Sequence, residues 1–287
     1  MIKIALSHDI DRTKKTYQFF TKPIRTLFNG NFKHFKELLA TSFRRGNYWT
    51  FDDIIEIEKS FNIKSTFFFL NESINFNVFE PKSFVLSHGR YNIHEPKIVN
   101  LIRWLDNNGW EVGLHGSYNS FQNLELLKNE KAELEGILGH SIDGIRQHYL
   151  NLNKDTWHNH FVAGFKYDSS FGYTREIGFK EGRYQPFKPL DDEFIVVPLV
   201  VMDACFMSLP NRWERIDELM DICEKENAIL VVNFHNHVFN NNEFPGFRDA
   251  YIRIIEKGIE RNGDFQTISA HLQHMNIANK NMSLIRE

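Results

Sequence analysis

The sequence predicts an α/β fold in which a parallel sheet closes, or nearly closes, into a barrel of roughly seven to eight strands. Short apolar runs alternate with helix-like amphipathic stretches throughout the chain, which is typical of repeated strand–helix units. No linker, low-complexity segment or convincing internal repeat divides the chain, so we expect a single domain over residues 1–287. An open doubly wound sheet is the alternative. No glycine-rich phosphate loop opens a predicted helix, which argues against nucleotide binding.

The composition is that of a globular protein, with 42% hydrophobic and 25% charged residues. A net charge of -3 gives no electrostatic footprint for nucleic acid or an anionic membrane, and no apolar run approaches the length of a membrane span. Cys205 and Cys223 show no metal-ligand spacing, and we interpret them as buried thiols of a reducing compartment. The first strand starts at residue 2 with no signal peptide before it, so we expect a cytoplasmic protein.

The predicted elements follow one another in the order that a strand–helix barrel requires. The apolar runs predicted as strands are residues 2–6, 65–70, 111–115, 144–149, 165–171, 194–201 and 228–234, with a further short run around 265–268. Helical spacing marks residues 14–28, 32–45, 51–61, 95–108, 124–138, 153–163, 212–226 and 247–261, and a last helix from about 270. Residues 72–94 show no clear period, so we expect a loop insertion there, on the face where the second strand ends.

Local signals mark several helix boundaries. Pro96 and Gly109 frame the helix predicted between them, and Gly139 closes the helix that precedes it. Thr50, followed three residues later by Asp53, resembles a capping box at the start of its helix.

Two carboxylates, Asp9 and Asp11, follow the first strand. Residues at i and i+2 of a strand project to the same face, so these two side chains are expected side by side. Their repulsion is unfavourable unless a cation or a shared proton offsets it. The alternative is a solvated turn ahead of Arg12. His8 points out of phase with Asp9, and we expect it to have a packing or supporting role.

Polar residues gather at the predicted strand ends. In a barrel of this kind the active-site groups come from the carboxyl ends of different strands. The polar residues at those ends are Asp9, Asp11, His115, Ser117, Arg146, His148, Asp203, His235 and His237. Asp and His side chains that converge on one mouth suit a divalent metal, with Zn²⁺ bound through imidazole nitrogen and carboxylate oxygen.

These residues, in this order, resemble the motifs of the polysaccharide deacetylases of carbohydrate esterase family 4, in a divergent branch with a D-x-D first motif. The resemblance covers nearly the whole chain and implies a distorted (β/α) barrel. It implies that Asp9 is the catalytic base and Asp11 a metal ligand. Residues 146–149, RQHY, are similar to the motif whose arginine holds the base, which gives that role to Arg146. Residues 232–236, VNFHN, are similar to the motif of the histidine acid, which points to His235, with His237 as the rival.

The family's second motif, H-[ST]-x-x-H, supplies two metal histidines. Here residues 115–119 read HGSYN, so His115 fits and Asn119 stands where the second histidine would be. The third ligand is then either the Asn119 amide oxygen or His148, unless the metal site is lost. We favour His148, because its i+2 spacing from Arg146 puts both side chains on the inward face.

The resemblance implies a metal-dependent hydrolase that removes an acetyl group, foremost an N-acetyl group, from a sugar of a poly- or oligosaccharide or a glycan precursor. The expected cofactor is a divalent metal, with zinc favoured, and the expected partner is a carbohydrate. The alternatives are an O-acetyl esterase or other amide hydrolase on the same barrel, and a catalytically inactive glycan-binding relative. The aromatic residues that can stack on a sugar, or equally belong to the core, are Trp49, Tyr118, Tyr149 and Phe171. Two carboxylates that can orient Arg or His, or only cap turns, are Asp168 and Asp203.

Overall fold

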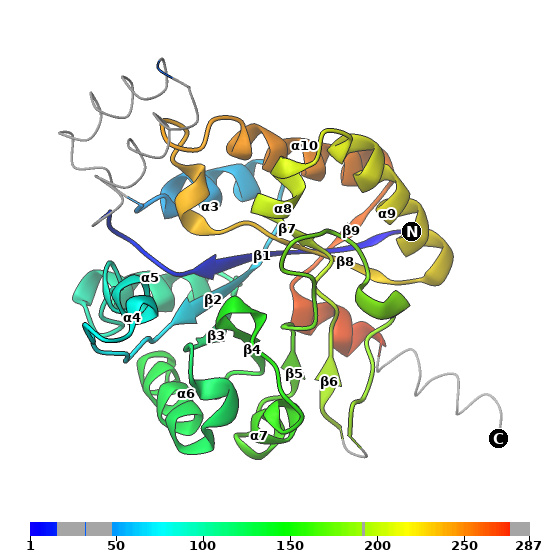
Figure 1. Cartoon of the computed structure of the whole chain (residues 1–287). Helices are drawn as coiled ribbons and strands as arrows, with labels where there is room; N and C mark the ends of the chain where they lie inside the picture. The colour runs from blue at the N-terminus through cyan, green and yellow to red at the C-terminus, as the bar shows by residue number, and fades with distance from the viewer. Residues whose placement is uncertain (16–31, 33–47, 191–192, 276–287) are drawn as a thin grey trace, which may run out of the picture.

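The computed structural model describes residues 1–15, 32, 48–190 and 193–275, and its architecture is a curled parallel sheet covered by helices (Figure 1). The strands are β1 (Lys3–Ile10), β2 (Thr66–Leu70), β3 (Glu111–Gly116), β4 (Gly144–Gln147), β5 (Tyr167–Asp168), β6 (Ile195–Val196), β7 (Val201–Met202), β8 (Ile229–Asn233) and β9 (Asp264–Phe265). They are ordered β6-β5-β4-β3-β2-β1-β8-β7, each neighbouring pair is parallel, and β9 pairs with the start of β1. The predicted distorted (β/α) barrel is confirmed.

The ring of strands is completed by the chain between β6 and β7. The single strand predicted over residues 194–201 is wrong, because two two-residue strands stand there, one paired with β5 and the other with β8. Pro198 lies between them and has no N–H group for a continuous ladder. The N–H of Val197 donates to a β5 carbonyl at 2.8 Å, and that of Val200 donates to a β8 carbonyl at 3.1 Å. This short stretch therefore passes from one edge of the sheet to the other, which is where the barrel is distorted.

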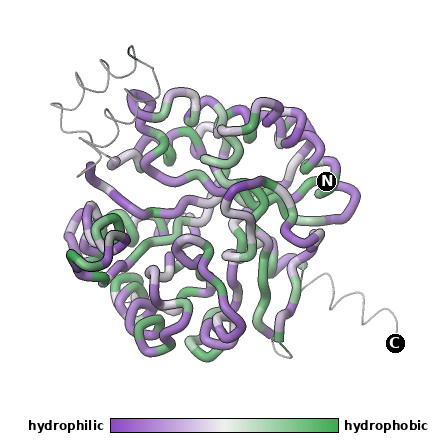
Figure 2. Tube along the Cα trace, viewed as in Figure 1, coloured by the Kyte–Doolittle hydropathy of each residue, from purple (hydrophilic) through white to green (hydrophobic). Residues whose placement is uncertain are grey.

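Helices cover the outer face of the sheet and alternate between hydrophobic and hydrophilic residues (Figure 2). The longer ones are α3 (Phe51–Ser60), α5 (Pro96–Asn107), α6 (Leu124–Leu138), α9 (Arg212–Glu226) and α10 (Phe247–Glu260). The shorter ones are α4 (Pro81–Ser87), α7 (Thr156–Val162) and α8 (Asp203–Ser208), and single 3₁₀ turns are η1 (Ser120–Gln122), η2 (His148–Leu150), η3 (Lys180–Gly182) and η4 (Asn236–Phe239). The segment 72–94 contains α4.

Strand β1 divides the core into two layers. Its residues Ile4, Leu6 and Ile10 join the large apolar cluster between sheet and helices, whereas Ala5 joins a smaller cluster inside the barrel. Along this strand bulky residues thus point outward and small residues inward, in the alternation that strand geometry imposes. The inward face leads directly to the mouth of the barrel, where β1 ends.

Several boundaries differ from the sequence-based prediction. The first strand, predicted over 2–6, runs from Lys3 to Ile10, so Asp9 lies within it and Asp11 just after it. The strand predicted over 144–149 ends at Gln147, because η2 follows with Tyr149 in the left-handed region at φ 59°. The strand predicted over 165–171 is reduced to the two residues of β5. The capping box is not formed, because the Thr50 hydroxyl donates to the Asn236 carbonyl at 2.6 Å instead. In contrast, Gly139 ends α6 at φ 83° as expected.

Some predictions fall outside the described residues. The helices predicted over 14–28 and 32–45 lie largely in segments that the structure does not describe. Residues 268–275 are helical where the last helix was predicted, and the chain beyond 275 is again outside the described part. Cys205 and Cys223 are both buried and unpaired thiols. Among the described residues no helix has the length and apolar character needed to cross a membrane.

Candidate metal centre and catalytic site

Asp11 follows β1 and is surrounded by three imidazoles that come from other strand ends. The Nε2 atoms of His115, at the end of β3, and of His148, after β4, lie 3.3 Å and 3.8 Å from Asp11 Oδ1. His235, after β8, places its Nε2 atom 3.8 Å from Asp11 Oδ2. Because parallel strands end at the same edge of the barrel, side chains far apart in the sequence meet here. One ligand atom from each of Asp11, His115 and His148 lies within 4.8 Å of the others.

Each of these imidazoles turns its other ring nitrogen, Nδ1, toward an acceptor. His115 Nδ1 donates to a backbone carbonyl of β4 at 2.8 Å, and His235 Nδ1 donates to the Asp203 carboxylate at 2.9 Å. His148 Nδ1 faces the Glu72 carboxylate at 3.7 Å. An acceptor at Nδ1 keeps the proton on that nitrogen and leaves the Nε2 lone pair available to a metal.

The residues around Asp11 fit a divalent metal ion. Asp11 Oδ1 is buried and makes no hydrogen bond within the described residues, which is costly for a carboxylate oxygen unless a cation or proton lies beside it. Two atoms that each lie about 2.0–2.2 Å from one zinc ion are at most about 4.4 Å apart. The 3.3 and 3.8 Å separations between Asp11 Oδ1 and the two Nε2 atoms fall within that limit. One carboxylate and two imidazoles, His115 and His148, form a donor set that zinc accepts.

The electrostatics of the cluster favour charged groups. Burial raises the pKa of Asp11, but the neighbouring His148 and His115 outweigh burial and bring it well below its ordinary value. Burial lowers the pKa of His115, while Asp9 and Asp11 raise it above its ordinary value. The mouth thus stabilises a positive charge beside Asp11, supplied by a proton or by a metal ion.

Asp9 is held by the fully buried guanidinium of Arg146. Arg146 Nη1 donates to Asp9 Oδ1 at 2.9 Å and also approaches the Ser7 hydroxyl and the Asn233 amide oxygen, at 2.9 and 2.8 Å. The Asn233 amide donates to Asp9 Oδ2 at 2.9 Å, and Ser169 accepts from Arg146 Nε and Nη2 at 3.0 Å. Burial raises the pKa of Asp9, but Arg146, His115 and His235 together outweigh burial and lower that pKa below its ordinary value. Asp9 is therefore an anchored, ionised carboxylate.

The buried carboxylate of Asp203 lies behind the His235 ring, on the side away from Asp11. Asp203, the first residue of α8, accepts from the His235 backbone N–H at 2.8 Å and from its Nδ1 at 2.9 Å. Burial lowers the pKa of His235, but Asp203 outweighs burial and raises it to about 10. The His237 ring lies against Tyr48 and Phe244, at centroid distances of 5.4 and 5.2 Å. Of the two histidines it is His235 that contacts Asp11.

The fold is shared with several solved structures of low sequence identity. A proposed polysaccharide deacetylase from Mycobacterium smegmatis aligns over 97% of this chain and 92% of its own, with 16% identity and a TM-score of 0.59. The allantoinase PuuE aligns over 95% and 89%, with 15% identity and a TM-score of 0.59. A 4-alpha-glucanotransferase from Thermococcus litoralis aligns over 96% of this chain but 38% of its own, at 14% identity and a TM-score of 0.55. No protein-family model and no curated protein sequence matches. The likeness establishes the fold.

Two residues of the mouth were not singled out from the sequence. Asn233 is the last residue of β8, and Glu72 lies two residues beyond the end of β2. Both obey the strand-end rule that identified the other site residues. Asn233 carries no charge to mark it, and Glu72 lay inside the segment predicted as a loop insertion. A search for any polar side chain within two residues of each strand end would have found both.

The remaining polar candidates take supporting roles. Asp168 accepts from the Ser170 backbone N–H at 2.9 Å and lies 3.4 Å from His160 Nδ1, so it caps a turn and faces an imidazole of α7. Asp203 orients the imidazole of His235 at the mouth. His8 is buried on the outward face of β1, where its ring nitrogens contact the Phe234 carbonyl at 2.7 Å and Glu58 at 2.9 Å. The packing role predicted for His8 is confirmed.

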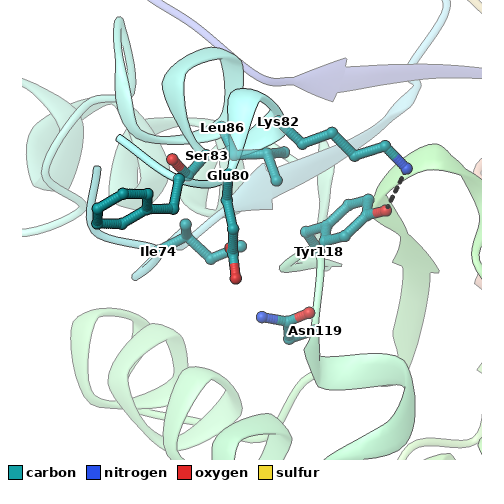
Figure 3. A pocket seen from close by; sticks show the side chains of 8 residues that line it. Ile74, Glu80, Lys82, Ser83, Leu86, Tyr118 and Asn119 are labelled. Atoms are coloured by element: carbon teal, nitrogen blue, oxygen red, sulfur yellow. Dashed lines mark hydrogen bonds between the residues drawn. The ribbon is translucent and has the colours of Figure 1, made fainter. Parts of the chain in front are cut away.

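A pocket of about 570 Å³ lies beside the mouth, between α4 and the chain that follows β3 (Figure 3). It is lined by Ile74, Phe79, Glu80, Lys82, Ser83, Leu86, Tyr118 and Asn119. The Tyr118 ring lies 5.6 Å from that of Tyr149, which in turn lies 4.5 Å from the His148 ring. These ring contacts connect the pocket with the metal-ligand candidates. Asn119 contributes to this pocket.

The four aromatic candidates separate into different surroundings. Tyr149 is 54% exposed at the mouth, next to Tyr118. Phe171 is buried against Trp157 and Phe187, so of its two alternatives it takes the place in the core. Trp49 lines a separate groove between α3 and α5.

Proposed function

We propose that this chain is a metal-dependent deacetylase of the polysaccharide deacetylase type, which hydrolyses an acetamido group on a sugar. The observation that carries the proposal is the convergence of three imidazole Nε2 atoms on the partly buried carboxylate of Asp11. The Asp9–Arg146 pair lies beside that cluster, on the same face of β1. The shared fold of the proposed deacetylase from Mycobacterium smegmatis supports this assignment.

In this proposal Asp11, His115 and His148 hold the metal. When bound, the ion polarises the acetyl carbonyl and lowers the pKa of the attacking water. Asp9 accepts a proton from that water, and the Arg146 guanidinium keeps Asp9 ionised until then. The new bond joins the water oxygen to the acetyl carbon, and the carbon–nitrogen bond breaks to give acetate and the sugar amine.

His235 is the proposed acid. With Nδ1–H held by Asp203 and Nε2 directed to the mouth, its imidazolium form can donate the Nε2 proton to the leaving amine. The pKa of about 10 keeps the imidazolium populated at neutral pH. After the reaction His235 regains a proton and Asp9 loses one, so the cycle is balanced by exchange with water.

The pocket beside α4 supports a substrate larger than one sugar. Its wall combines the aromatic ring of Tyr118 with the polar side chains of Lys82 and Asn119 (Figure 3). An aromatic face with amide and charged groups around it suits a sugar ring, whose faces are apolar and whose edges carry hydroxyls. We infer that a neighbouring unit of an oligosaccharide occupies this pocket.

The test compares Asp11→Ala with Asp106→Ala. Asp106 lies on α5 and also faces an imidazole, His140 at 3.0 Å, but on the surface. Asp11→Ala is expected to abolish both stoichiometric zinc binding and acetate release from an N-acetylated oligosaccharide, and Asp106→Ala to leave both unchanged. If the wild-type protein binds no divalent metal and Asp11→Ala leaves acetate release unchanged, the proposal fails. Absent metal with absent activity would favour an inactive glycan-binding relative.

A second candidate is another amide hydrolase on the same barrel. The allantoinase PuuE and the proposed deacetylase align with this chain at the same TM-score, so the fold favours neither activity over the other. Product release from matched substrates that carry an N-acetyl sugar, an O-acetyl sugar or a small cyclic amide separates these activities.

A further inference from the structure

We propose that Glu72 is a positioning residue for the metal site, which holds His148 with Nε2 toward Asp11 and so compensates for the histidine absent at position 119. The inference rests on the proposed metal site. Glu72 comes from the chain after β2, and His148 follows β4, so the pair joins two strand ends. Sequence spacing relative to the metal motifs gives no sign of this contact.

The Glu72 carboxylate is fixed before any metal binds. Its Oε2 atom accepts from the Tyr118 backbone N–H at 2.9 Å, and its Oε1 atom accepts from that of Ile74 at 3.1 Å. Arg90 donates to the carbonyls of Glu72 and Ile74, both at 2.7 Å, and so fixes the local backbone. The side chain is 1% exposed. Glu72 is therefore a preorganised acceptor in a set position.

The imidazole of His148 needs such an acceptor. Its Nδ1 atom is buried and makes no hydrogen bond within the described residues, and Glu72 Oε2 lies 3.7 Å away. This separation exceeds hydrogen-bond length by less than about 1 Å. A carboxylate at Nδ1 selects the tautomer with the proton on that atom and increases the basicity of Nε2 toward a metal.

The other two imidazoles show the same arrangement with different acceptors. His115 uses a backbone carbonyl of β4 and His235 uses Asp203, both at hydrogen-bond distance. All three rings thus present Nε2 to Asp11 and Nδ1 to an acceptor. Glu72 completes this set for the one ring that would otherwise have none.

The alternative is that Glu72 only holds the local chain in place and does not act through His148. Glu72 also ties residues 72–74 to the chain after β3, so its removal could act through the pocket wall alone. The two roles separate in a double-mutant cycle, because a positioning residue acts through His148 and a loop anchor does not.

The experiment measures zinc affinity by chelator competition, which does not depend on catalysis. Glu72→Ala is expected to weaken zinc binding by roughly 10–100-fold in the wild-type background. In the His148→Ala background the same substitution is expected to have less than about a threefold further effect. Glu133→Ala is the matched control, because the exposed Glu133 carboxylate accepts from Asn71, the neighbour of Glu72, at 2.5 Å and lies 3.5 Å from the imidazole of His94.

A second readout reports on His148 directly. Nitrogen-15 NMR of the metal-free protein should show His148 with its proton on Nδ1, and Glu72→Ala should lose that preference while Glu133→Ala keeps it. If a folded Glu72→Ala variant binds zinc as tightly as the wild type, the role of Glu72 is refuted and the proposed metal site is not. The same holds if Glu72→Ala weakens zinc binding equally in the wild-type and His148→Ala backgrounds. Failure of the wild-type protein to bind zinc overturns the proposed function as well, so the two failures are distinguishable. If Glu72→Ala does not fold, Glu72→Gln replaces it, because the amide loses the charge but keeps one acceptor oxygen.

Discussion

The mouth of the barrel has two halves that satisfy their polar atoms in opposite ways. The base half consists of Asp9, Arg146 and Asn233, in which both carboxylate oxygens and the guanidinium have hydrogen-bond partners. The metal half consists of Asp11 and His148 together with His115, and within the described residues it contains a carboxylate oxygen and a ring nitrogen with no hydrogen bond. A carboxylate held by its own hydrogen bonds is already positioned, whereas a carboxylate oxygen without one can accept a cation or a proton. The base half is therefore preorganised by the protein alone, and in the metal half Asp11 Oδ1 is left available for the metal ion proposed above.

The largest expected effect comes from breaking the base half. Arg146→Met leaves the Asp9 carboxylate buried without its cation, and the loss of one partner of a buried pair costs about 3–5 kcal/mol. The free energy of unfolding of the metal-free protein, measured by urea denaturation, should fall by that amount. The matched change in the metal half, Asp11→Asn, should cost less than Arg146→Met, since Asp11 is partly exposed and its loss removes only the attraction to the neighbouring imidazoles. Equal losses in the two variants would contradict the contrast between the halves.

A second buried carboxylate sharpens the comparison, because it lacks the cation that Asp9 has. Glu130 on α6 accepts from the Ser117 backbone N–H at 3.1 Å, beneath the metal half. Burial raises the pKa of Glu130 from 4.5 to about 8, whereas Arg146 lowers that of Asp9 against the same burial. The effect of burial on a carboxylate is therefore decided here by the neighbouring charge.

The pH dependence of stability follows from this shift. Between pH 4.5 and about 8 the folded state holds a proton on Glu130 that the unfolded state has released, so the free energy of unfolding falls as the pH rises. Glu130→Gln keeps an acceptor for Ser117 and removes the titration. Relative to wild type, its stability should rise over that window by on the order of 5 kcal/mol, as measured by urea denaturation at several pH values. Parallel pH profiles of the two proteins would contradict the raised pKa.

The sequence was sufficient for the barrel and for much of the mouth, for a common physical reason. Strand phase and the convergence of parallel strand ends are local rules, and they placed Asp9, Asp11, His115 and Arg146 together without any knowledge of loops. The same rule placed His8 on the opposite face from Asp9, because successive residues of a strand point to opposite sides. The faces of these residues therefore follow from the two-residue period of the strand.

What the sequence could not supply depends on the path of the chain between elements. The split of the run 194–201 follows from how the barrel closes around Pro198, which strand propensity does not encode. The Thr50 hydroxyl donates to a carbonyl of η4 and accepts no hydrogen bond from the backbone of its own helix. The path of the chain after β2 brings the Glu72 carboxylate to 3.7 Å from His148 Nδ1. Contacts of this kind join residues distant in sequence, so no local pattern predicts them.

The smallest expected effect concerns the choice of third ligand, and it tests the metal half most directly. Asn119→Ala should change zinc affinity by less than about twofold, because its side chain lines the pocket beside α4 (Figure 3). His148→Ala should weaken binding by more than the roughly 10–100-fold expected for loss of a supporting residue. Both affinities are measured by chelator competition. The reverse order would make the Asn119 amide oxygen the ligand and leave His148 as a hydrogen-bonding residue of the mouth. Equal, small effects would mean that Asp11 and His115 bind the ion with water in the remaining positions, and the metal half would then be less complete than the base half beside it.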